Sequence, residues 1–311
     1  MLFSEVSNQS VTLKQSLLSS LPKLGVGLLY NPSLPEFLRT HEDAVDFLAI
    51  IPDMFQRDRG VGQSPRFLEL EAWVEFLDLM LERYTLVGHH VGLSLGTAGT
   101  LDKQYLERVV CWEQRCNFAW HSDHLSFAQI RGPYAHDDHN AGLAIPVPYD
   151  QDVLDMIAAN IIEVQQAVPK PFIIENNVYY VDFPDQDMSE PEFLNGLTRQ
   201  TGCGLLLDIH NLYANARNHN FEAVEFLDQL DLNNVIEIHI AGGNEFAGMY
   251  TDSHSGPCPD PVWELLEVVV PRASNLCAIT FEFHESYYPT LKEKGIRSEL
   301  DRAREIWSRT H

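Results

Sequence analysis

Eight short hydrophobic segments recur along the chain and alternate with longer amphipathic segments. The short segments are rich in β-branched and aromatic residues and show little polar alternation, which is typical of strands buried on both faces of a parallel sheet. The predicted strands cover residues 26–29, 47–51, 86–95, 119–126, 172–175, 204–208, 235–240 and 278–283.

The segments between these strands repeat apolar residues at spacings of three and four, as amphipathic helices do. The predicted helices cover residues 34–43, 65–84, 102–115, 151–168, 190–200, 221–230, 260–270 and 298–309. The helix at 65–84 is expected to begin at Pro65, because proline suits the first turn of a helix. Residues 127–149 show no regular pattern, and we expect them to form a long loop after the fourth strand that acts as a lid or a substrate wall.

Eight strand–helix alternations predict an α/β fold, a (β/α)₈ barrel of the TIM type. A chain of 311 residues is within the usual length of one such barrel. We therefore expect one domain over residues 1–311, with a barrel core at about 25–290 and a C-terminal helix at 295–310. The alternatives are two smaller domains or an open doubly wound sheet, but no glycine-rich phosphate-binding motif follows a predicted strand.

Charge and cysteine usage restrict the function classes. The net charge of −24 and the absence of a basic run argue against a nucleic-acid partner. No apolar run approaches the roughly 20 residues that span a bilayer, and the N-terminus lacks a signal-peptide pattern. The five scattered cysteines, without a Cys-x-x-Cys pair, favour a reducing compartment. We expect a cytoplasmic protein that acts away from membranes.

Histidine and acidic residues occur at or just after the ends of six consecutive predicted strands, the third to the eighth. The segments are His89-His90, His121-Ser-Asp123-His124, Glu175-Asn-Asn, Asp208-Ile-His210-Asn211, Glu237-Ile-His239 with Asp252-Ser-His254 in the following loop, and Glu282-Phe-His284. Because barrel active sites form at the C-terminal ends of the strands, these side chains are expected to meet at one rim. Mixed nitrogen and oxygen ligands favour iron, manganese or zinc.

Alternation along a strand separates some of these residues. His90 should point away from His89, because neighbouring strand residues face opposite sides of a sheet. His41, His121, His136, His139, His284 and His311 are each interpreted as structural histidines.

Seven segments together resemble one known family in their order. They are HHVGLSLG (89–96), SDHLSF (122–127), IIENN (173–177), LLLDIHNLYANARNHN (205–220), EIHIAGG (237–243), TDSHSGPCPDPVWELLE (251–267) and FEF (281–283). The family is that of the multinuclear non-heme iron-dependent oxidative enzymes, which includes the methanobactin biosynthesis oxidase. The resemblance extends from about Gly25 to Glu285.

This resemblance implies a cluster of two or three iron ions, with Glu175 as a bridging carboxylate. The implied ligands are His89, His124, Glu175, Asp208, His239, Asp252, His254 and Glu282. His210, Asn211, Asn176 and Asp53 are candidates for a further ligand or for residues that orient the ligands. His210 replaces an asparagine that is common in the family, and Asp53 stands where a glutamate is frequent.

The resemblance also implies an activity. Members of the family that the chain resembles modify peptides, mostly at cysteine, with O₂ as co-substrate. They often act with a separate protein that recognises the leader of the precursor peptide. We therefore expect an iron-dependent oxidase that acts in the biosynthesis of a ribosomally made, modified peptide.

Other functions remain open for this barrel type. A zinc phosphodiester hydrolase, similar to the endonuclease that cleaves at abasic sites, uses a similar ordered ligand set, although the charge of −24 disfavours DNA. A sugar isomerase is a further alternative, but Lys170 precedes its strand and so belongs to the opposite rim. The last alternative is an inactive barrel that binds a partner.

Overall fold

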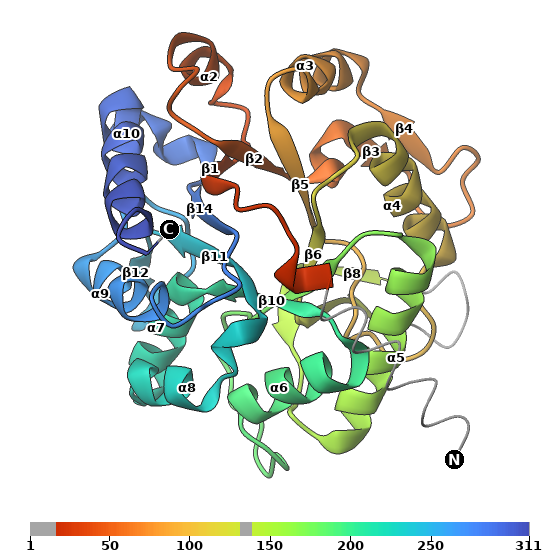
Figure 1. Cartoon of the computed structure of the whole chain (residues 1–311). Helices are drawn as coiled ribbons and strands as arrows, with labels where there is room; N and C mark the ends of the chain where they lie inside the picture. The colour runs from red at the N-terminus through yellow and green to blue at the C-terminus, as the bar shows by residue number, and fades with distance from the viewer. Residues whose placement is uncertain (1–16, 131–138, 311) are drawn as a thin grey trace.

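The computed structural model describes residues 17–130 and 139–310, and these residues form a closed barrel of eight parallel strands (Figure 1). The predicted fold class is therefore confirmed. In barrel order the strands are β1 (Gly25–Leu29), β14 (Ala278–Glu282), β11 (Val235–Ala241), β10 (Gly204–Asp208), β9 (Phe172–Glu175), β6 (His121–His124), β5 (Thr85–His90) and β2 (Phe47–Ile50).

Helices surround the barrel and connect consecutive strands (Figure 1). They are α2 (Pro35–Thr40), α3 (Glu71–Leu81), α4 (Lys103–Cys116), α5 (Gln151–Ala167), α6 (Glu190–Thr201), α7 (Ile209–His219), α8 (Ala223–Gln229), α9 (Asp260–Val269) and α10 (Tyr288–Trp307), with short 3₁₀ turns η1 (Pro52–Phe55), η2 (Leu232–Asn234) and η3 (Glu285–Tyr287). Helix α10 begins ten residues before the predicted start at 298 and contains a break at Lys292, where φ is 52°. Helix α7 was not predicted.

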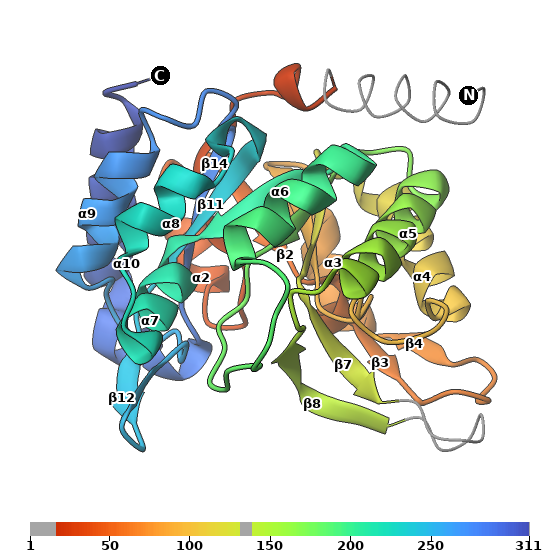
Figure 2. The same ribbon diagram turned by 90° about the horizontal axis from the view of Figure 1, so that it is seen from below.

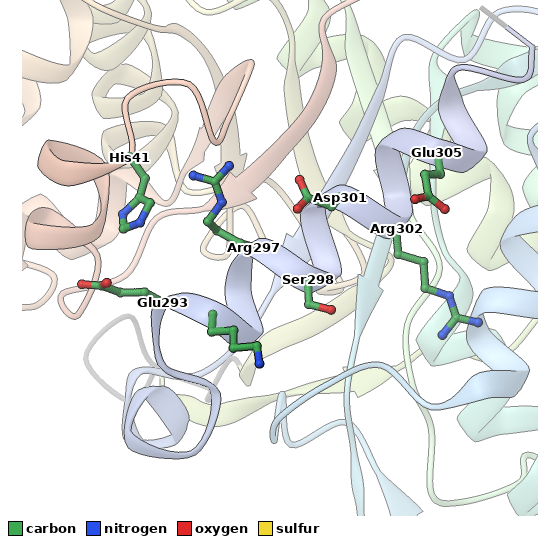
Figure 3. Close-up of a pocket in the computed structure, with 8 residues that line it drawn as sticks. His41, Glu293, Arg297, Ser298, Asp301, Arg302 and Glu305 are labelled. Atoms are coloured by element: carbon green, nitrogen blue, oxygen red, sulfur yellow. The ribbon is translucent and has the colours of Figure 1, made fainter.

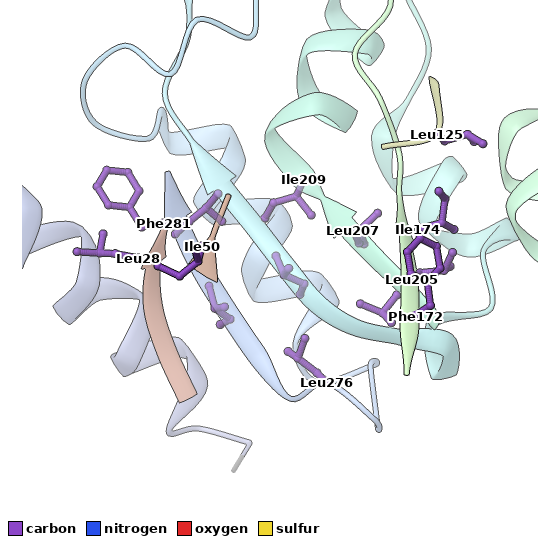
Figure 4. Packing of buried hydrophobic residues seen from close by; sticks show 14 of the residues in the cluster. Leu28, Ile50, Leu125, Phe172, Ile174, Leu205, Leu207, Ile209, Leu276 and Phe281 are labelled. Carbon is purple, nitrogen blue, oxygen red and sulfur yellow. The ribbon is translucent and has the colours of Figure 1, made fainter. Parts of the chain in front are cut away.

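Two groups of buried apolar side chains hold the barrel together. The larger group fills the space between strands and helices, and includes Leu28, Leu205, Leu207 and Phe281 (Figure 4). The smaller group comes from alternate strand positions, such as Phe47, Ala49, Val87 and Trp120, and so fills the barrel interior. Burying one such side chain contributes about 1.5–3 kcal/mol to the free energy of unfolding.

Close packing makes one glycine of the first strand essential. A Cβ atom on Gly27 would lie 2.6 Å from the carbonyl oxygen and from the ring of Phe47. Any larger residue there would force β1 away from β2, its hydrogen-bonded neighbour.

The predicted start of the helix at residue 65 is wrong. Residues Phe67–Glu69 instead form strand β4, which pairs with β3 (Gln56–Asp58), and α3 begins only at Glu71. Buried Arg66 fixes this arrangement, because its guanidinium donates to Asp58 at 2.7 Å and to Asp102 at 2.6 Å. These contacts outweigh the helix-start signal of Pro65.

The predicted irregular loop at 127–149 is also wrong for its described part. Strands β7 (Ser126–Ile130) and β8 (His139–Pro146) pair as an antiparallel hairpin, with Phe127 opposite Ile145. A second hairpin, β12 (Asn244–Phe246) with β13 (Met249–Thr251), follows β11. Figure 2 shows both hairpins and the β3–β4 pair extending from one side of the barrel, beyond the C-terminal ends of the strands.

Within residues 17–130 and 139–310, no helix has the length and apolar character needed to cross a membrane.

Candidate metal centre

The strand register brings the predicted ligands together in adjacent pairs. His124 at the end of β6 lies beside Glu175 at the end of β9, and Asp208 at the end of β10 lies beside His239 of β11. Neighbouring strands are about 4.8 Å apart, so side chains at the same level and on the same face come within reach of one ion. All these residues lie at the C-terminal ends of their strands, as predicted.

Glu175 lies at the centre of the cluster, and its two oxygens face different residues. Oε2 is 3.6 Å from His89 Nε2 and 3.3 Å from His124 Nε2. Oε1 is 3.7 Å from His239 Nδ1. Two groups, His89–His124–Glu175 and Glu175–Asp208–His239, each place one ligand atom per residue within 4.8 Å of one another. A carboxylate placed in this way could contact two ions.

A third group adjoins these two on the side of β14 and the loop after β13. Glu282 connects the third group to the second, with Oε1 2.9 Å from His239 Nδ1 and Oε2 3.4 Å from His254 Nε2. Asp252 Oδ1 is 2.9 Å from His254 Nε2 and 3.1 Å from His210 Nδ1. His254 has a φ of 49°, a strained conformation for a non-glycine residue that is common at functional sites.

Buried polar atoms without hydrogen-bond partners provide a test of whether these residues suit a metal. In the cluster they are Glu175 Oε2, Asp208 Oδ2 and His210 Nε2, together with His210 Nδ1, His239 Nδ1 and Asp252 Oδ1, whose contacts at 2.9 and 3.1 Å lack hydrogen-bond geometry. Each buried unpaired polar group costs about 1–3 kcal/mol, so a concentration of them requires a compensating ligand. All are lone-pair donors of the kinds that bind iron, manganese or zinc. The residues therefore fit a cluster of such ions.

Hydrogen bonds on the far side of two histidine rings select the nitrogen that faces the cluster. Ser122 Oγ donates to the carbonyl oxygen of Gly88 (3.5 Å) and lies 2.8 Å from His89 Nδ1. In this arrangement Ser122 Oγ can accept the Nδ1 proton, which would leave the lone pair on Nε2. His239 Nε2 lies 3.2 Å from Glu237 Oε1, so that its lone pair is on Nδ1. Partners of this kind fix ring orientation in metal sites.

Glu237 is itself held rigidly in the barrel interior. Trp120 Nε1 donates to it at 2.8 Å and Thr280 Oγ1 at 2.6 Å. Its oxygens are thus already occupied, which makes Glu237 a residue that positions His239 rather than a ligand. The sequence interpretation gave Glu237 no role, although its spacing of two from His239 places both on one strand face and could have indicated it.

Asparagines fix the position of Asp208. Asn176 Nδ2 donates to the Asp208 carbonyl oxygen at 2.9 Å, and Asn176 Oδ1 accepts from the Asp208 amide at 2.8 Å. Asp208 also caps α7, since its Oδ1 accepts from the Asn211 amide at 2.7 Å. These contacts use one carboxylate oxygen and leave Oδ2 for the cluster. Asn176 and Asn211 thus orient a candidate ligand.

The concentration of buried charge shifts the pKa values of the cluster in both directions. Burial, reinforced by Asp208 and Glu282, raises the pKa of Glu175 well above its ordinary value. Burial and the charge of Asp252 raise the pKa of Asp208 to about 7. Burial and the neighbouring His124 lower the pKa of His89. Burial thus disfavours the charged forms of these three residues. Against the effect of burial, the charge of Glu282 raises the pKa of His239, and the charge of Asp252 raises the pKa of His254 to about 10.

A comparison with models of protein families identifies the family of the chain. Residues 23–308 match the family model described as "RiPP precursor modification enzyme MbnB/TglH/ChrH", where RiPP denotes a ribosomally made, modified peptide. The chain belongs to this family.

Relatives of the MbnB/TglH/ChrH family match over most of the chain. A UPF0276 protein of Caulobacter vibrioides is 33% identical over 285 residues, which cover 91% of this chain and 94% of the relative. A UPF0276 protein of Rhizorhabdus wittichii is 35% identical over 229 residues, with 74% and 76% covered. The family resemblance inferred from the sequence is thus confirmed.

Solved structures share the barrel at low identity. Endonuclease IV from Thermus thermophilus aligns with a TM-score of 0.56 at 14% identity, covering 93% of this chain and all of that one. D-psicose 3-epimerase from Clostridium cellulolyticum aligns with a TM-score of 0.56 at 10% identity, covering 92% and 98%. Identities this low show the common fold alone.

Several candidate residues lie outside the cluster of this family member. Asp53 accepts a hydrogen bond from the Tyr105 hydroxyl at 2.6 Å, and the structure does not bring it to the other candidates. His90 faces away from the site, as predicted, and stacks on His121, which is hydrogen-bonded to Glu113. His284 caps η3, His41 stacks on Phe37, and the side chains of His136, His139 and His311 lie outside the described residues.

A cavity of about 310 Å³ opens above the cluster and gives access to it. Its walls combine ligand candidates with apolar side chains, among them Leu29, Ile51, Met54, Val91 and Phe283. A larger hollow of about 690 Å³ lies along α10, but its charged side chains, such as Glu293 and Arg302, spread along the helix and do not converge (Figure 3). The smaller space is therefore the one that adjoins the candidate ligands.

Proposed function

We propose that this member of the RiPP-modification family is an oxidase with two or three iron ions, which uses O₂ to modify a precursor peptide at cysteine. One observation carries the proposal: unpartnered, buried histidine and carboxylate atoms converge around Glu175 at the C-terminal rim of the barrel. Family membership supplies the peptide substrate class.

In this proposal the ligands divide into three sets, of which the first two share Glu175. His89, His124 and Glu175 would hold one iron, and Glu175, Asp208, His239 and Glu282 would hold the second. His210, Asp252 and His254 would hold a third. Iron bound there would supply electrons for the reduction of O₂ and, by coordination, lower the pKa of a substrate thiol.

The protein contributes binding, orientation and exclusion of water. The apolar walls of the 310 Å³ cavity suit the backbone and side chain of a single modified residue rather than a folded partner. Burial raises the pKa of Tyr30 to about 12, so its hydroxyl remains protonated near neutral pH. Tyr30 lines this cavity, and in this proposal its hydroxyl would donate a hydrogen bond to the bound peptide.

Leader recognition is assigned to a separate protein in this proposal. The hairpins β7–β8 and β12–β13 extend beyond the rim where the cavity opens and offer edge strands for such a contact (Figure 2). Phe246 at the β12 edge is 74% exposed, as expected of an apolar residue that a partner covers.

Metal analysis and peptide mass spectrometry test the function together. Protein purified without oxygen should contain two or more iron atoms per chain and little zinc. With O₂, iron and a cysteine-containing precursor encoded beside its gene, with and without the neighbouring proteins, it should change the mass of the peptide. A peptide with serine in place of the cysteine should remain unmodified. Stoichiometric zinc together with cleavage of abasic-site DNA would overturn the proposal in favour of a hydrolase.

A further inference from the structure

A second cavity lies away from the metal centre, between the start of α6 and the start of α8. Its volume is about 230 Å³, below the range typical of sites for drug-sized ligands. The two helices are neighbours in the outer ring (Figure 1), and Asn195 Nδ2 of α6 donates to the carbonyl oxygen of Gln229 of α8 at 2.8 Å. The space suits one extended side chain.

Glu190 in this cavity is an unusual residue. It is 6% exposed, and its Oε1 has no hydrogen-bond partner, although the Tyr149 hydroxyl donates to the carboxylate. An acidic residue at the start of a helix ordinarily remains in solvent and stabilises the helix dipole. The buried, unpartnered oxygen of Glu190 calls for another explanation.

Helix capping does not supply that explanation. Ser189 caps α6 in a capping box with Glu192, whose carboxylate accepts from the Ser189 amide at 2.8 Å and from its hydroxyl at 2.9 Å. The start of α6 therefore has its acidic partner in Glu192. Glu190 is free to serve a ligand.

The remaining lining residues define the chemistry of that ligand. Tyr179, Pro191, Phe221 and Phe226 provide apolar and aromatic surface, while exposed Glu222 and Glu225 add negative charge at the edge. Among the described residues that line the cavity there is no lysine or arginine. Aromatic rings with a buried carboxylate favour an alkyl chain that ends in a cation.

We propose that this cavity binds one basic side chain, an alkylguanidinium or alkylammonium group, of the peptide substrate. The aromatic residues cover the aliphatic stem and Glu190 pairs with the cation. Assigning the side chain to the peptide rests on the proposed function, whereas the cation site itself does not. Tyr179 follows Glu175 by four residues, so the cavity belongs to the loop region that leaves the metal centre.

Proton release provides a signature of the pair. Burial raises the pKa of Glu190 to about 8, so the empty cavity holds a protonated carboxyl near neutral pH. A cation that enters favours the ionised form and displaces the proton. Binding should therefore release up to one proton per ligand at pH 7.

Calorimetry on the iron-loaded full-length protein tests the site with agmatine and n-butylamine as probes. We expect saturable binding, with a heat that depends on the buffer because a proton is released. Glu190→Gln should weaken binding by about tenfold or more and abolish the proton release. Glu192→Gln, on the same helical turn but not in the cavity, should retain both.

Two outcomes overturn the cation site: no binding of either probe by the unchanged protein, or equal binding by the Glu190→Gln variant. The peptide assignment has a separate test, in which replacing basic residues of the precursor by glutamine should raise KM without lowering kcat. An unchanged KM for every such peptide overturns that assignment. Because probe binding requires no oxidation, agmatine binding by a protein that fails to oxidise peptide refutes the proposed function alone.

Discussion

Substitution of Glu175 by glutamine should have opposite effects on the protein with and without iron. The carboxylate is 2% exposed, and burial together with Asp208 and Glu282 raises its pKa well above the ordinary value. In the metal-free protein such an acid destabilises the fold above the pKa of the unfolded chain, because the folded state retains a proton that the unfolded state releases. Glutamine removes this cost but cannot bridge two cations.

The size of each effect follows from the geometry. Removing one buried, unpaired acidic oxygen should stabilise the metal-free protein by about 1–3 kcal/mol. Iron in about 1,000-fold excess over its dissociation constant adds about 4 kcal/mol per site, and Glu175 faces both sets of ligands. At roughly 2 °C per kcal/mol for a chain of this size, the metal-free variant should melt about 2–6 °C above wild type. The iron-induced rise of about 8–16 °C in wild type should largely disappear.

Thermal unfolding followed by circular dichroism, with iron content measured on the same samples, provides the assay. Glu113→Gln is the matched control, since Glu113 is also a buried carboxylate but its oxygen already accepts from the Phe118 amide at 3.1 Å and contacts His121. The control should bind iron normally. If the Glu175→Gln variant retains wild-type iron content and the same iron-induced shift, the bridging role would be refuted.

Three further predictions concern residues around the cluster and the second cavity. His210→Ala should reduce iron content by about one atom per chain, because both ring nitrogens lack partners and Nδ1 lies 3.1 Å from Asp252; undiminished iron would exclude a third site there. Glu237→Gln should weaken iron binding by about 10–100-fold in competition with a chelator, because it orients His239, and unchanged affinity would leave Glu237 a purely structural role. The Glu190→Gln variant should become more stable relative to wild type as pH rises from 4.5 to about 8, because the folded wild type holds a proton that the unfolded chain releases. Urea unfolding at pH 5 and 8.5 should show that the difference in free energy of unfolding between the two proteins widens by at most about 1.4 kcal/mol per pH unit. A constant difference would contradict the burial of this carboxyl.

The strands were predictable because burial on both faces leaves a continuous apolar run. Strands β9 and β10 were predicted at the observed bounds, Phe172–Glu175 and Gly204–Asp208. Helix α7 was missed for the opposite reason, since several of its buried positions are polar. His210, Asn211 and Asn215 are each at most 2% exposed and interrupt the apolar period that marks a helix. A buried helix face that is polar therefore conceals the helix from a search for a hydrophobic pattern.

In the candidate site, too, some features follow from the sequence of one strand and others depend on residues far away in the chain. Alternation along β5 was enough to separate His89 from His90, because the strand itself sets the two directions. The role of a buried carboxylate depends instead on which distant groups already occupy its oxygens. Trp120 and Thr280, which are 117 and 43 residues away, donate hydrogen bonds to the Glu237 carboxylate. Glu237 therefore orients His239. Among the described residues none donates a hydrogen bond to Oε2 of Glu175, so this oxygen is available for a cation. Glu175 and Glu237 thus differ in their surroundings through contacts that the local sequence of neither residue encodes.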